Sequence, residues 1–580
     1  MANLIEEAKL QIESLLAAAY SSASEKGELP AGAQLSGTVE IPKDVANGDF
    51  AANHAMTGAR AMRMAPRKIA EALTANLSLD GSFFSAVEVA GPGFINFRLG
   101  ERWYGEVLRA VAAEGADYGR VDLGHGERVM VEFVSANPTG PMHMGNARGG
   151  VLGDAIASVL DRAGYSVWRE FYVNDAGNQI EKFASSIDAR YRQLILGEDK
   201  VEFPEDGYHG DDIKELARGF FEKYGEKYLN ADVAERHEAM AAYGLERNIP
   251  TMQSDLRRYG IEYDQWFFES TLHESGYVKD TVALLTGRGY TYEKDGALWL
   301  RTSQILAERL RREGKSEAEI EKLELKDDVL RRANGFYTYF AADIAYHRNK
   351  LEERGFARAI NVWGADHHGH VARLKGALDA LGIDGDRLEI VLMQLVKLLY
   401  EGQPVKMSKR TGKAISLTNL LDEIPVDAAR YFFNSRPESA VEFDLALAVR
   451  QDSENPVYYV QYAHARICSM LSALAEEGHR VPAAESVDVS LLSTPEEREL
   501  IKQLAALPEE IRQSALSLDP SRINRYVTEL AARFHKFYTV CRIKGAEPRL
   551  LEARLLLADS VRRVIALSLG IVGVSAPEKM

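Results

Sequence analysis

Residues 129–160, VMVEFVSANPTGPMHMGNARGGVLGDAIASVL, decide the fold of the chain. The short apolar run VMVEFVS predicts a strand, and Pro138, Gly140 and Pro141 favour a turn after it. Apolar residues then recur at helical spacing from Val151 to Leu160, which predicts a long helix. Backbone N–H groups and the helix dipole bind anions at the start of such a helix, so this strand, loop and helix predict a phosphate site in an α/β fold.

The size and composition of the chain predict several globular domains. Its 580 residues are 46% hydrophobic and 27% charged, so we expect roughly three to five domains. Cys468 and Cys541 are the only cysteines, which excludes a disulfide framework and a cysteine-based zinc site. The N-terminus lacks a basic leader and no apolar run reaches about 18 residues, so we expect a cytoplasmic protein without a membrane partner.

Charge is distributed unevenly along the chain. The net charge of −16 counts against a polyanionic partner, because phosphate binding needs clustered Lys and Arg. From Ser521 to the end, however, 11 Lys and Arg stand against 5 Asp and Glu, a local balance of +6. This tail can face nucleic acid.

The pattern along the chain predicts a nucleotide-type fold that is split by an insertion. VEVAGPGFINFRL, broken by Gly91-Pro92-Gly93, predicts a small α+β unit. A charged, mostly helical stretch then separates the first strand from further strand candidates, at which we expect a parallel sheet to resume. The candidates are GALWLRT, TYFAADIA, AINVWGA and LEIVLMQLV. The expected domains are 1–120, a split α/β domain at 121–190 and 291–400, an insertion at 191–290, a region at 401–455 and a helical bundle at 456–580.

Two loops carry the candidate chemistry. In the first, His143 can donate hydrogen bonds to a phosphate under attack, and Gly145 lets a nucleotide approach the backbone; the alternative is a plain turn with a capping histidine. The second, PVKMSKRTGKAIS, places Lys406, Lys409 and two further basic residues within eight positions. Spaced lysines are suited to a leaving pyrophosphate, and the alternative is a solvated basic loop.

Together the loops resemble the HIGH and KMSKS motifs of class I aminoacyl-tRNA synthetases, in the right order and about 260 residues apart. The resemblance implies a split Rossmann-like catalytic core in which His143, Lys406 and Lys409 stabilise the α-phosphate as the amino acid carboxylate displaces pyrophosphate. ATP is then a substrate, with Mg²⁺ on its phosphates and no zinc. Asn146 replaces the second histidine of the motif. The implied ATP-binding residues are Gly140, His143, Gly145, Asn146, His370, Lys406, Met407, Ser408 and Lys409.

Four further segments resemble arginyl-tRNA synthetases: VEFVSANPTGP, TYFAADIAYH, VWGADHHGH and NPVYYVQYAHARI. Carboxylates with an aromatic wall suit a guanidinium, which has five N–H donors in a rigid fork. The implied arginine-binding residues are Glu132, Asn137, His143, Tyr339, Asp343 and Asp366. The alternatives are a core role for Tyr339, a helix cap at Asp343 and, for ADHHGH, a polar turn or a metal site.

The two ends of the chain resemble tRNA-contacting domains of the same family. ADSVRRVIALSLGIVGVSAPEKM resembles the DALR-type anticodon-binding bundle, and GDFAANHAM resembles the appended domain that meets the outer corner of the tRNA. Aromatic and basic side chains of the bundle suit unpaired bases and phosphates, although aromatic residues at helical spacing are also typical of a core. The candidate tRNA-binding residues are Tyr458, Tyr462, Arg522, Arg525, Lys536 and Arg542. The region at 401–455 is expected to carry the second loop and to contact the acceptor stem.

The resemblance therefore implies a monomeric enzyme that activates L-arginine with ATP and transfers it to the 3′ end of tRNA-Arg, with activation itself requiring tRNA. A class I synthetase for another amino acid, such as cysteine or glutamine, is the nearest rival hypothesis. A zinc-dependent cysteine pocket conflicts with the position of both cysteines in the C-terminal third. Two more distant hypotheses are a catalytically silent tRNA-binding relative and a nucleotidylyltransferase that does not use tRNA.

Overall fold

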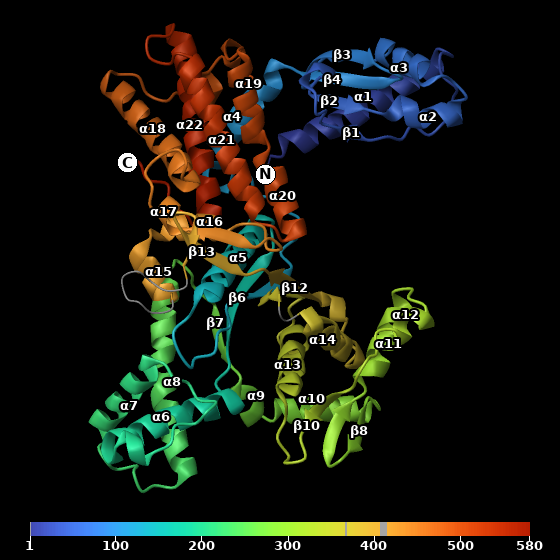
Figure 1. Ribbon diagram of the computed structural model, residues 1–580. Coiled ribbons are helices and arrows are strands. Elements are labelled where there is room, and N and C mark those ends of the chain that lie inside the picture. The colour runs from blue at the N-terminus through green and yellow to red at the C-terminus, as the bar shows by residue number, and fades with distance from the viewer. Residues whose placement is uncertain (1, 366–367, 406–414) are drawn as a thin grey trace.

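The computed structural model describes residues 2–365, 368–405 and 415–580. The molecule is elongated (Figure 1): a helical bundle and a small N-terminal domain occupy one end, a parallel sheet lies in the middle, and two lobes project from the other end. The candidate residues at 366 and at 406–409 lie outside the described residues.

The N-terminal domain is the α+β unit that the sequence predicts. Its sheet has the order β1-β2-β4-β3, and VEVAGPGFINFRL forms the antiparallel hairpin β3–β4. Three helices cover this sheet, and a fourth leads away to the bundle. The elements are α1 (Leu4–Glu25), β1 (Val39–Glu40), β2 (Phe50–Ala52), α2 (His54–Met62), α3 (Pro66–Ala75), β3 (Phe84–Ala90), β4 (Phe94–Leu99) and α4 (Glu101–Glu114).

The central sheet is parallel and has the order β12-β11-β5-β6-β7. The prediction of a split sheet is confirmed, because β11 and β12 join β5 from far along the chain. Catalytic groups in such open α/β sheets lie at the carboxyl ends of the strands, where the strand order reverses. The elements are β5 (Arg128–Glu132), α5 (Met144–Arg162), β6 (Ser166–Val173), β7 (Gln265–Phe268), β11 (Arg358–Gly364) and β12 (Leu388–Met393).

The insertion differs from its predicted course in one respect. A helical lobe leaves the sheet after β6, as expected, but β7 falls within residues 191–290 and pairs in parallel with β6. QWFF, four residues long, is too short to show a strand period within a charged helical stretch. The lobe consists of α6 (Asn178–Leu196), α7 (Asp211–Tyr224) and α8 (Val233–Arg258).

A second lobe corrects two strand predictions. GALWLRT forms β9 of an antiparallel sheet with the order β10-β9-β8, separate from the parallel sheet. TYFAADIA is helix α13, because Thr338 caps the N-terminus and the three alanines favour a helix. The lobe contains α9 (Ser270–Glu274), α10 (Tyr277–Gly287), β8 (Thr291–Lys294), β9 (Ala297–Leu300), α11 (Thr302–Arg312), α12 (Glu317–Glu321), β10 (Asp328–Arg331), α13 (Tyr339–Arg348) and α14 (His368–Ala380).

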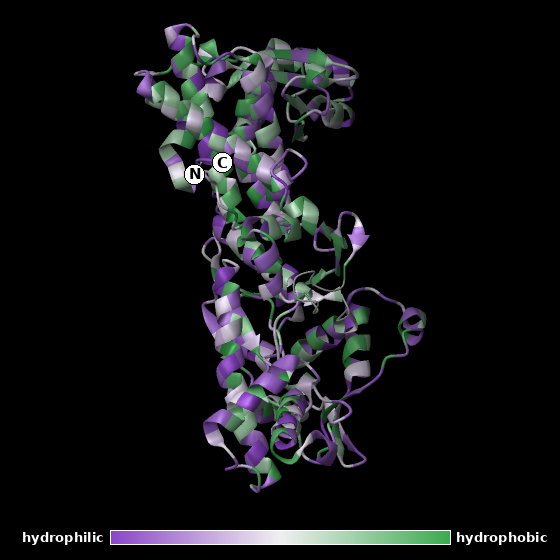
Figure 2. Ribbon diagram, turned by 60° about the vertical axis from the view of Figure 1, so that its left-hand side comes forward, coloured by the Kyte–Doolittle hydropathy of each residue, from purple (hydrophilic) through white to green (hydrophobic). Residues whose placement is uncertain are grey.

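A small unit joins the parallel sheet to the bundle. Strand β13 pairs with β14 antiparallel and with β15 parallel. The predicted helical bundle follows, and its long helices show hydrophobic and hydrophilic residues interspersed along their length (Figure 2). These elements are β13 (Val396–Tyr400), β14 (Gln403–Pro404), α15 (Leu417–Glu423), α16 (Val426–Phe433), β15 (Val441–Asp444), α17 (Leu445–Ala448), α18 (Pro456–Glu476), α19 (Pro495–Ala505), α20 (Leu507–Ser517), α21 (Ser521–Val540) and α22 (Pro548–Ile571).

Helix α5 is enclosed by the rest of the molecule. It packs against β6 and β11 on one side and against α16, α20 and α22 on the other. A Cβ atom on Gly153 would lie 2.1 Å from the ring of Phe133, and one on Gly150 would lie 2.8 Å from Ile261. Side chains there would collide with the core, so glycine allows the helix to lie close to its neighbours.

Across the described part of the chain, no helix combines the length and the apolar character needed to cross a bilayer.

Candidate active site

The first loop leaves the sheet with a strained backbone. Val134 and Ser135 have φ values of 69° and 41°, a left-handed conformation that is costly for a β-branched residue such as Val134. Two hydrogen bonds hold the turn: Ser135 Oγ donates to Glu132 Oε1 at 2.9 Å and accepts from the Tyr172 N–H at 3.1 Å. The strain lies directly before the predicted phosphate site, as at other functional turns.

His143 occupies the N-cap of α5, where the sequence places an anion site. Its backbone N–H donates to Asn146 Oδ1 at 3.0 Å, so the side chain of Asn146 closes the first turn. Partial burial lowers the pKa of the His143 ring below its usual value. At neutral pH the ring is therefore uncharged and retains one N–H donor.

The segment after the second loop lies against the first loop. His143 and Ser416 form an antiparallel bridge, and the Leu417 N–H donates to the Met142 carbonyl at 2.9 Å. On the other side of the undescribed residues, the Val405 N–H donates to Leu398 O at 2.8 Å. The chain on both sides of residues 406–414 is thus tied to described structure, and Ser416 is beside His143. Lys406, Met407, Ser408 and Lys409 themselves lie outside the described residues.

Tyr339 and Asp343 come together at the start of α13. The Tyr339 hydroxyl accepts a hydrogen bond from the Gln179 N–H at 3.2 Å, and the ring packs against Gly177 at the start of α6. The Nε2 atom of His370 lies 3.0 Å from Asp343 Oδ2. The structure thus brings together Asp343 and His370, which the sequence marks in two separate motifs, and Asp343 lies within α13 and does not act as a helix cap. Asp366 lies outside the described residues.

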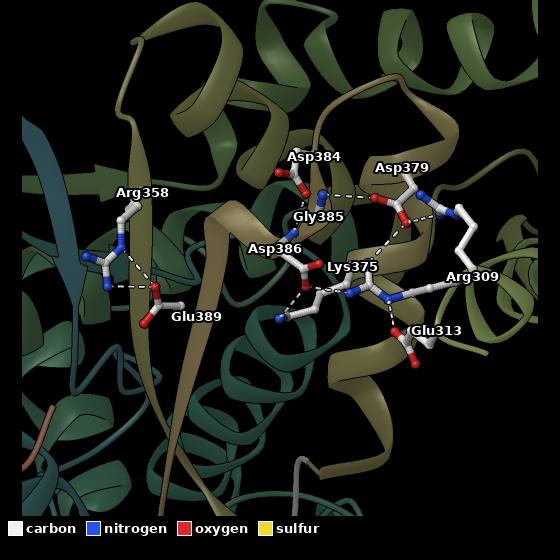
Figure 3. A network of polar contacts seen from close by, with 10 residues as sticks. Arg309, Glu313, Arg358, Lys375, Asp379, Asp384, Gly385, Asp386 and Glu389 are labelled. Atoms are coloured by element: carbon white, nitrogen blue, oxygen red, sulfur yellow. Dashed lines mark hydrogen bonds and ion pairs between the residues drawn. The ribbon is translucent and has the colours of Figure 1, made fainter. Parts of the chain in front are cut away.

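Helix α14, which carries His370, is fixed to α11 by a network of ion pairs (Figure 3). Arg309 pairs with Asp379 at 3.0 Å, and Lys375 pairs with Asp386 at 3.2 Å. Asp379 also accepts a hydrogen bond from the Gly385 N–H at 2.9 Å. Individual surface pairs stabilise little, but a connected network restrains the helix.

Glu132 is buried and already paired. Its carboxylate forms an ion pair with Lys350, which is fully buried, and accepts a hydrogen bond from Asn361 Nδ2 at 3.0 Å. Removing one partner would leave an uncompensated charge in the core. The contacts therefore tie Glu132, at the end of β5, to Lys350 and to Asn361 of β11. Asn137, by contrast, is exposed at the mouth of the first loop.

Four residues beside the predicted ones were not predicted from the sequence. Tyr172, at the end of β6, is nine-tenths buried; burial raises the pKa of its hydroxyl well above the usual value, and the charges of Glu269 and Asp343 add to this rise. Glu269 is itself buried. In the helical lobe, Asn248 Nδ2 donates to the Pro138 carbonyl at 2.8 Å, and Asp212 lies against Gly140. The signal for Tyr172 was the β-branched and aromatic content of SVWREFYV, typical of a strand; the other three give none, because only the fold places them here.

The predicted tRNA-binding residues divide into two groups. Tyr458 and Tyr462 stack on α18 with ring centroids 6.1 Å apart, and Tyr462 is 39% exposed. The basic residues are engaged within the bundle: Arg522 pairs with Glu510, Arg525 with Asp519 and Lys536 with Glu496, while Arg542 donates to the Lys544 carbonyl.

Three further residues extend the aromatic surface on α18. His535 stacks on Tyr462, and the Arg466 guanidinium lies 5.5 Å from the Tyr462 ring and 4.5 Å from the Tyr538 ring. We call Tyr458, Tyr462, Arg466, His535 and Tyr538 the α18 patch. The spacing of Tyr458, Tyr462 and Arg466, four residues apart, was the available sequence signal.

An open cavity of about 610 Å³ lies between α6 and α8. Gly177, Glu181, Asp232 and His237 contribute to its lining. It touches the site only at Gly177, which contacts Tyr339. His143, the candidate catalytic residue that the structure describes, does not line it.

Comparisons with known proteins agree with this geometry. Residues 10–99 match the arginyl tRNA synthetase N terminal domain, residues 107–442 the class I (R) tRNA synthetase catalytic domain, and residues 460–580 the DALR anticodon binding domain. The chain is 52% identical to arginine–tRNA ligase of Acetivibrio thermocellus and 53% identical to that of Caldanaerobacter subterraneus, each over 100% of both chains. The structure of Thermus thermophilus arginyl-tRNA synthetase shares the fold at a TM-score of 0.72 and 23% identity, covering 98% of this chain and 100% of that one.

Proposed function

The chain belongs to the arginyl-tRNA synthetase family and is an arginine–tRNA ligase, and on this premise we propose how its residues carry out the reaction. Arginine is first activated: its carboxylate attacks the α-phosphate of ATP, the bond between the α- and β-phosphates breaks, and pyrophosphate leaves. A ribose hydroxyl at the 3′ end of tRNA-Arg then attacks the arginyl carbonyl, and AMP leaves. The observation that carries this proposal is the bridge between His143 and Ser416, which brings the chain that directly follows residues 406–414 to the start of α5.

Phosphate binding is assigned to the first loop and the start of α5. The uncharged His143 ring donates a hydrogen bond, and the N-terminal turn of α5 adds backbone N–H groups with the positive end of the helix dipole. Gly140 and Gly145 let ATP approach the backbone, and Asn146 preserves this turn by accepting the His143 N–H. Lys406 and Lys409 supply positive charge to the phosphates as pyrophosphate departs, and Met407 and Ser408, which lie between them in the sequence, are assigned to ATP binding with them.

Arginine binding is assigned to the start of α13. Asp343 accepts N–H donors of the guanidinium, the Tyr339 ring forms an aromatic wall, and Glu269 with the Tyr172 hydroxyl lies at the buried end. Asn137 and Asp366 complete the polar contacts of the amino acid, while Glu132 acts through its buried pairing with Lys350. His370, on α14, lies between the arginine side and the ATP side.

Magnesium is assigned to ATP and not to a protein cage. Within the described ranges, no group of three or more His, Cys, Asp or Glu is placed to hold a metal ion, so these residues do not fit a resident Mg²⁺. Magnesium usually binds ATP through the phosphates and keeps several water ligands. We therefore derive no step through a protein-bound metal.

The α18 patch is assigned to unpaired bases of the tRNA, because aromatic and guanidinium faces stack on bases of any sequence. The N-terminal domain, residues 1–120, is assigned to a second tRNA contact. The free thiols of Cys468 and Cys541 support a reducing compartment such as the cytoplasm. We propose a monomer as the active form.

Arginine-dependent exchange of pyrophosphate into ATP, with and without tRNA, tests the proposal. We expect exchange only when arginine and tRNA are both present. Lys409→Ala should lower the exchange rate much more than it weakens ATP binding, because the lysine acts on the departing phosphates. Equal losses in both would assign Lys409 to ground-state phosphate binding, and charging with an amino acid other than arginine would overturn the proposal.

A further inference from the structure

Arg148, on the first turns of α5, is fully buried and has no role in the assignments above. Burial lowers the pKa of its guanidinium to about 10, and the charge of Glu438 opposes this decrease. A buried cation is costly unless its donors are satisfied. The partners of this guanidinium therefore indicate what it stabilises.

Those partners are backbone carbonyls from two chain segments. Nη1 donates to the Gln394 carbonyl at 2.5 Å. Nη2 donates to the carbonyls of Arg436 and Ser439 at 2.8 and 2.9 Å. The planar fork of an arginine can reach both segments at once, whereas the compact ammonium of a lysine cannot.

The two segments lead directly into β13 and β15, which run in parallel. The Gln394 N–H donates to Pro437 O at 3.0 Å, so the segments are already joined to each other. Arg148 adds the link from this pair to α5. Strand β13 then continues through β14 to Val405, which immediately precedes the second loop.

We infer that Arg148 is a positioning residue: it fixes to α5 the β13–β14 hairpin that leads into the second basic loop, and the action of Lys409 depends on this link. The downstream end of that loop is tied to the first loop directly, through Ser416 and Met142. Arg148 ties the upstream end, five residues from His143 on the same helix. The chain on both sides of residues 406–414 is thus tied to α5 or to the residues directly before it. The inference rests on the proposed role of Lys409.

Arg430 provides a matched control. It is also fully buried, and it forms an ion pair with Asp154 of α5. Its other donors, however, bind the carbonyls of Tyr259, at the end of α8, and of Val572, after α22, at 3.0 and 3.2 Å. It therefore anchors α5 equally firmly without contacting the strands that lead to the second loop.

A double-mutant cycle between Arg148→Lys and Lys409→Ala separates positioning from general stability. In tRNA-containing pyrophosphate exchange, we expect Arg148→Lys to lower kcat about 10- to 100-fold, as misplacement of a catalytic group does, with the KM for arginine changed less than about twofold. In the Lys409→Ala background, the same change should lower kcat less than about twofold, because the group that it positions is absent. Arg430→Lys should lower kcat by the same factor in both backgrounds.

An equal loss from Arg148→Lys in both backgrounds, or no loss in the wild type, would overturn the inference while leaving the proposed role of Lys409 intact. No effect of Lys409→Ala alone would overturn that role and the inference with it. If Arg148→Lys does not fold, as judged by circular dichroism, Arg148→Met replaces it in the cycle, because an apolar side chain of similar length leaves no buried charge unpaired.

Discussion

We propose that discrimination of the amino acid depends most on Asp343. Its carboxylate, on α13, lies 3.0 Å from His370 Nε2, and its negative charge helps to raise the pKa of Tyr172. Asp343→Asn removes the negative charge but keeps the shape, and should raise the KM for arginine about 100-fold, as expected when a desolvated charge pair loses one partner. Steady-state pyrophosphate exchange measures this change.

Citrulline provides the control for this variant, because it replaces the guanidinium by a neutral urea group of the same shape. Asp343→Asn should weaken arginine far more than citrulline, so the preference for arginine over citrulline should decrease. A uniform loss for both amino acids would show that the carboxylate acts on the fold of the pocket and not on the guanidinium.

At the scale of single residues, the sequence indicated which residues lie near one another better than it indicated which residues they contact. Asp343 and His370, from two separate motifs, do meet, whereas the Tyr339 hydroxyl contacts Gln179 at the start of α6. The direct contact of Glu132 with arginine stays a prediction, but its pairing with Lys350, remote in sequence, was not predicted. A pairing across 218 positions leaves no local pattern, so only the fold identifies it.

Tyr462 is the exposed ring of the α18 patch. Tyr462→Ala should weaken tRNA-Arg binding by about 1–3 kcal/mol, which is the usual value for loss of a base-stacking ring. Filter binding at fixed salt measures this change. Tyr462→Phe keeps the ring and should bind as the wild type does; if both variants lose affinity equally, the hydroxyl and not the stacking face would be the contact.

At the scale of elements, helix α13 contains a buried histidine that makes stability depend on pH. His347 Nδ1 lies 2.8 Å from the Asp343 carbonyl, and Asn361 Nδ2 lies 3.0 Å from its Nε2. This arrangement suits the neutral ring with its proton on Nδ1. Burial lowers the pKa of His347 well below its usual value, and the nearby charge of Lys350 adds to this decrease.

Stability should therefore decrease in acid. The unfolded chain binds a proton at His347 near pH 6.5 while the folded chain does not, so the contribution is constant above that pH. Between about pH 6.5 and the lowered folded pKa, each unit of pH decrease should cost up to about 1.4 kcal/mol. Denaturation midpoints from pH 7.5 to 5.5 measure this trend, and His347→Gln should show a weaker dependence on pH than the wild type.

The type of an element was predictable where its hydrophobic pattern extended over many residues, and uncertain where the pattern was short. The apolar run of β5 and the glycine-broken hairpin β3–β4 were clear. GALWLRT has the composition of a buried strand, but parallel or antiparallel pairing depends on which strand lies beside it. TYFAADIA has strand-like aromatic residues at one end, and its cap and alanines determine the helix.

At the scale of the whole molecule, one of the contacts between the N-terminal domain and the bundle lies around Gly119. Tyr118, which is buried, donates from its hydroxyl to the Leu504 carbonyl at 2.9 Å. Gly119 has a φ of +85°, and a Cβ atom there would lie 2.8 Å from Leu507. A side chain at this position would push against α20.

Gly119→Ala should loosen this docking. The left-handed backbone costs about 1–2 kcal/mol, and the clash adds about 1–3 kcal/mol. We expect a lower Tm and a higher KM for tRNA, with the KM for arginine unchanged, in aminoacylation assays. Gly115→Ala is the matched control, since its φ is +55° but a Cβ atom would meet nothing within 4 Å. Equal effects of the two changes would assign the loss to backbone strain alone.

The overall arrangement was predictable as a series of domains but not as a shape. Composition and motifs gave the order of an α+β unit, a split α/β sheet and a helical bundle. The antiparallel sheet of the second lobe and the return of β7 to the parallel sheet depend on contacts between distant segments. Asp49 and Lys502, which pair between the N-terminal domain and the bundle, are likewise invisible to any local pattern.

Helix α5 is confined on nearly every side, with glycines where the core comes closest. Such a helix tolerates few substitutions. A larger side chain on one face would push the helix into the residues packed against its other face. New amino acid preferences would then have to arise in the lobes around it. In a laboratory evolution experiment, we expect helix α5 to accumulate fewer substitutions than the rest of the enzyme.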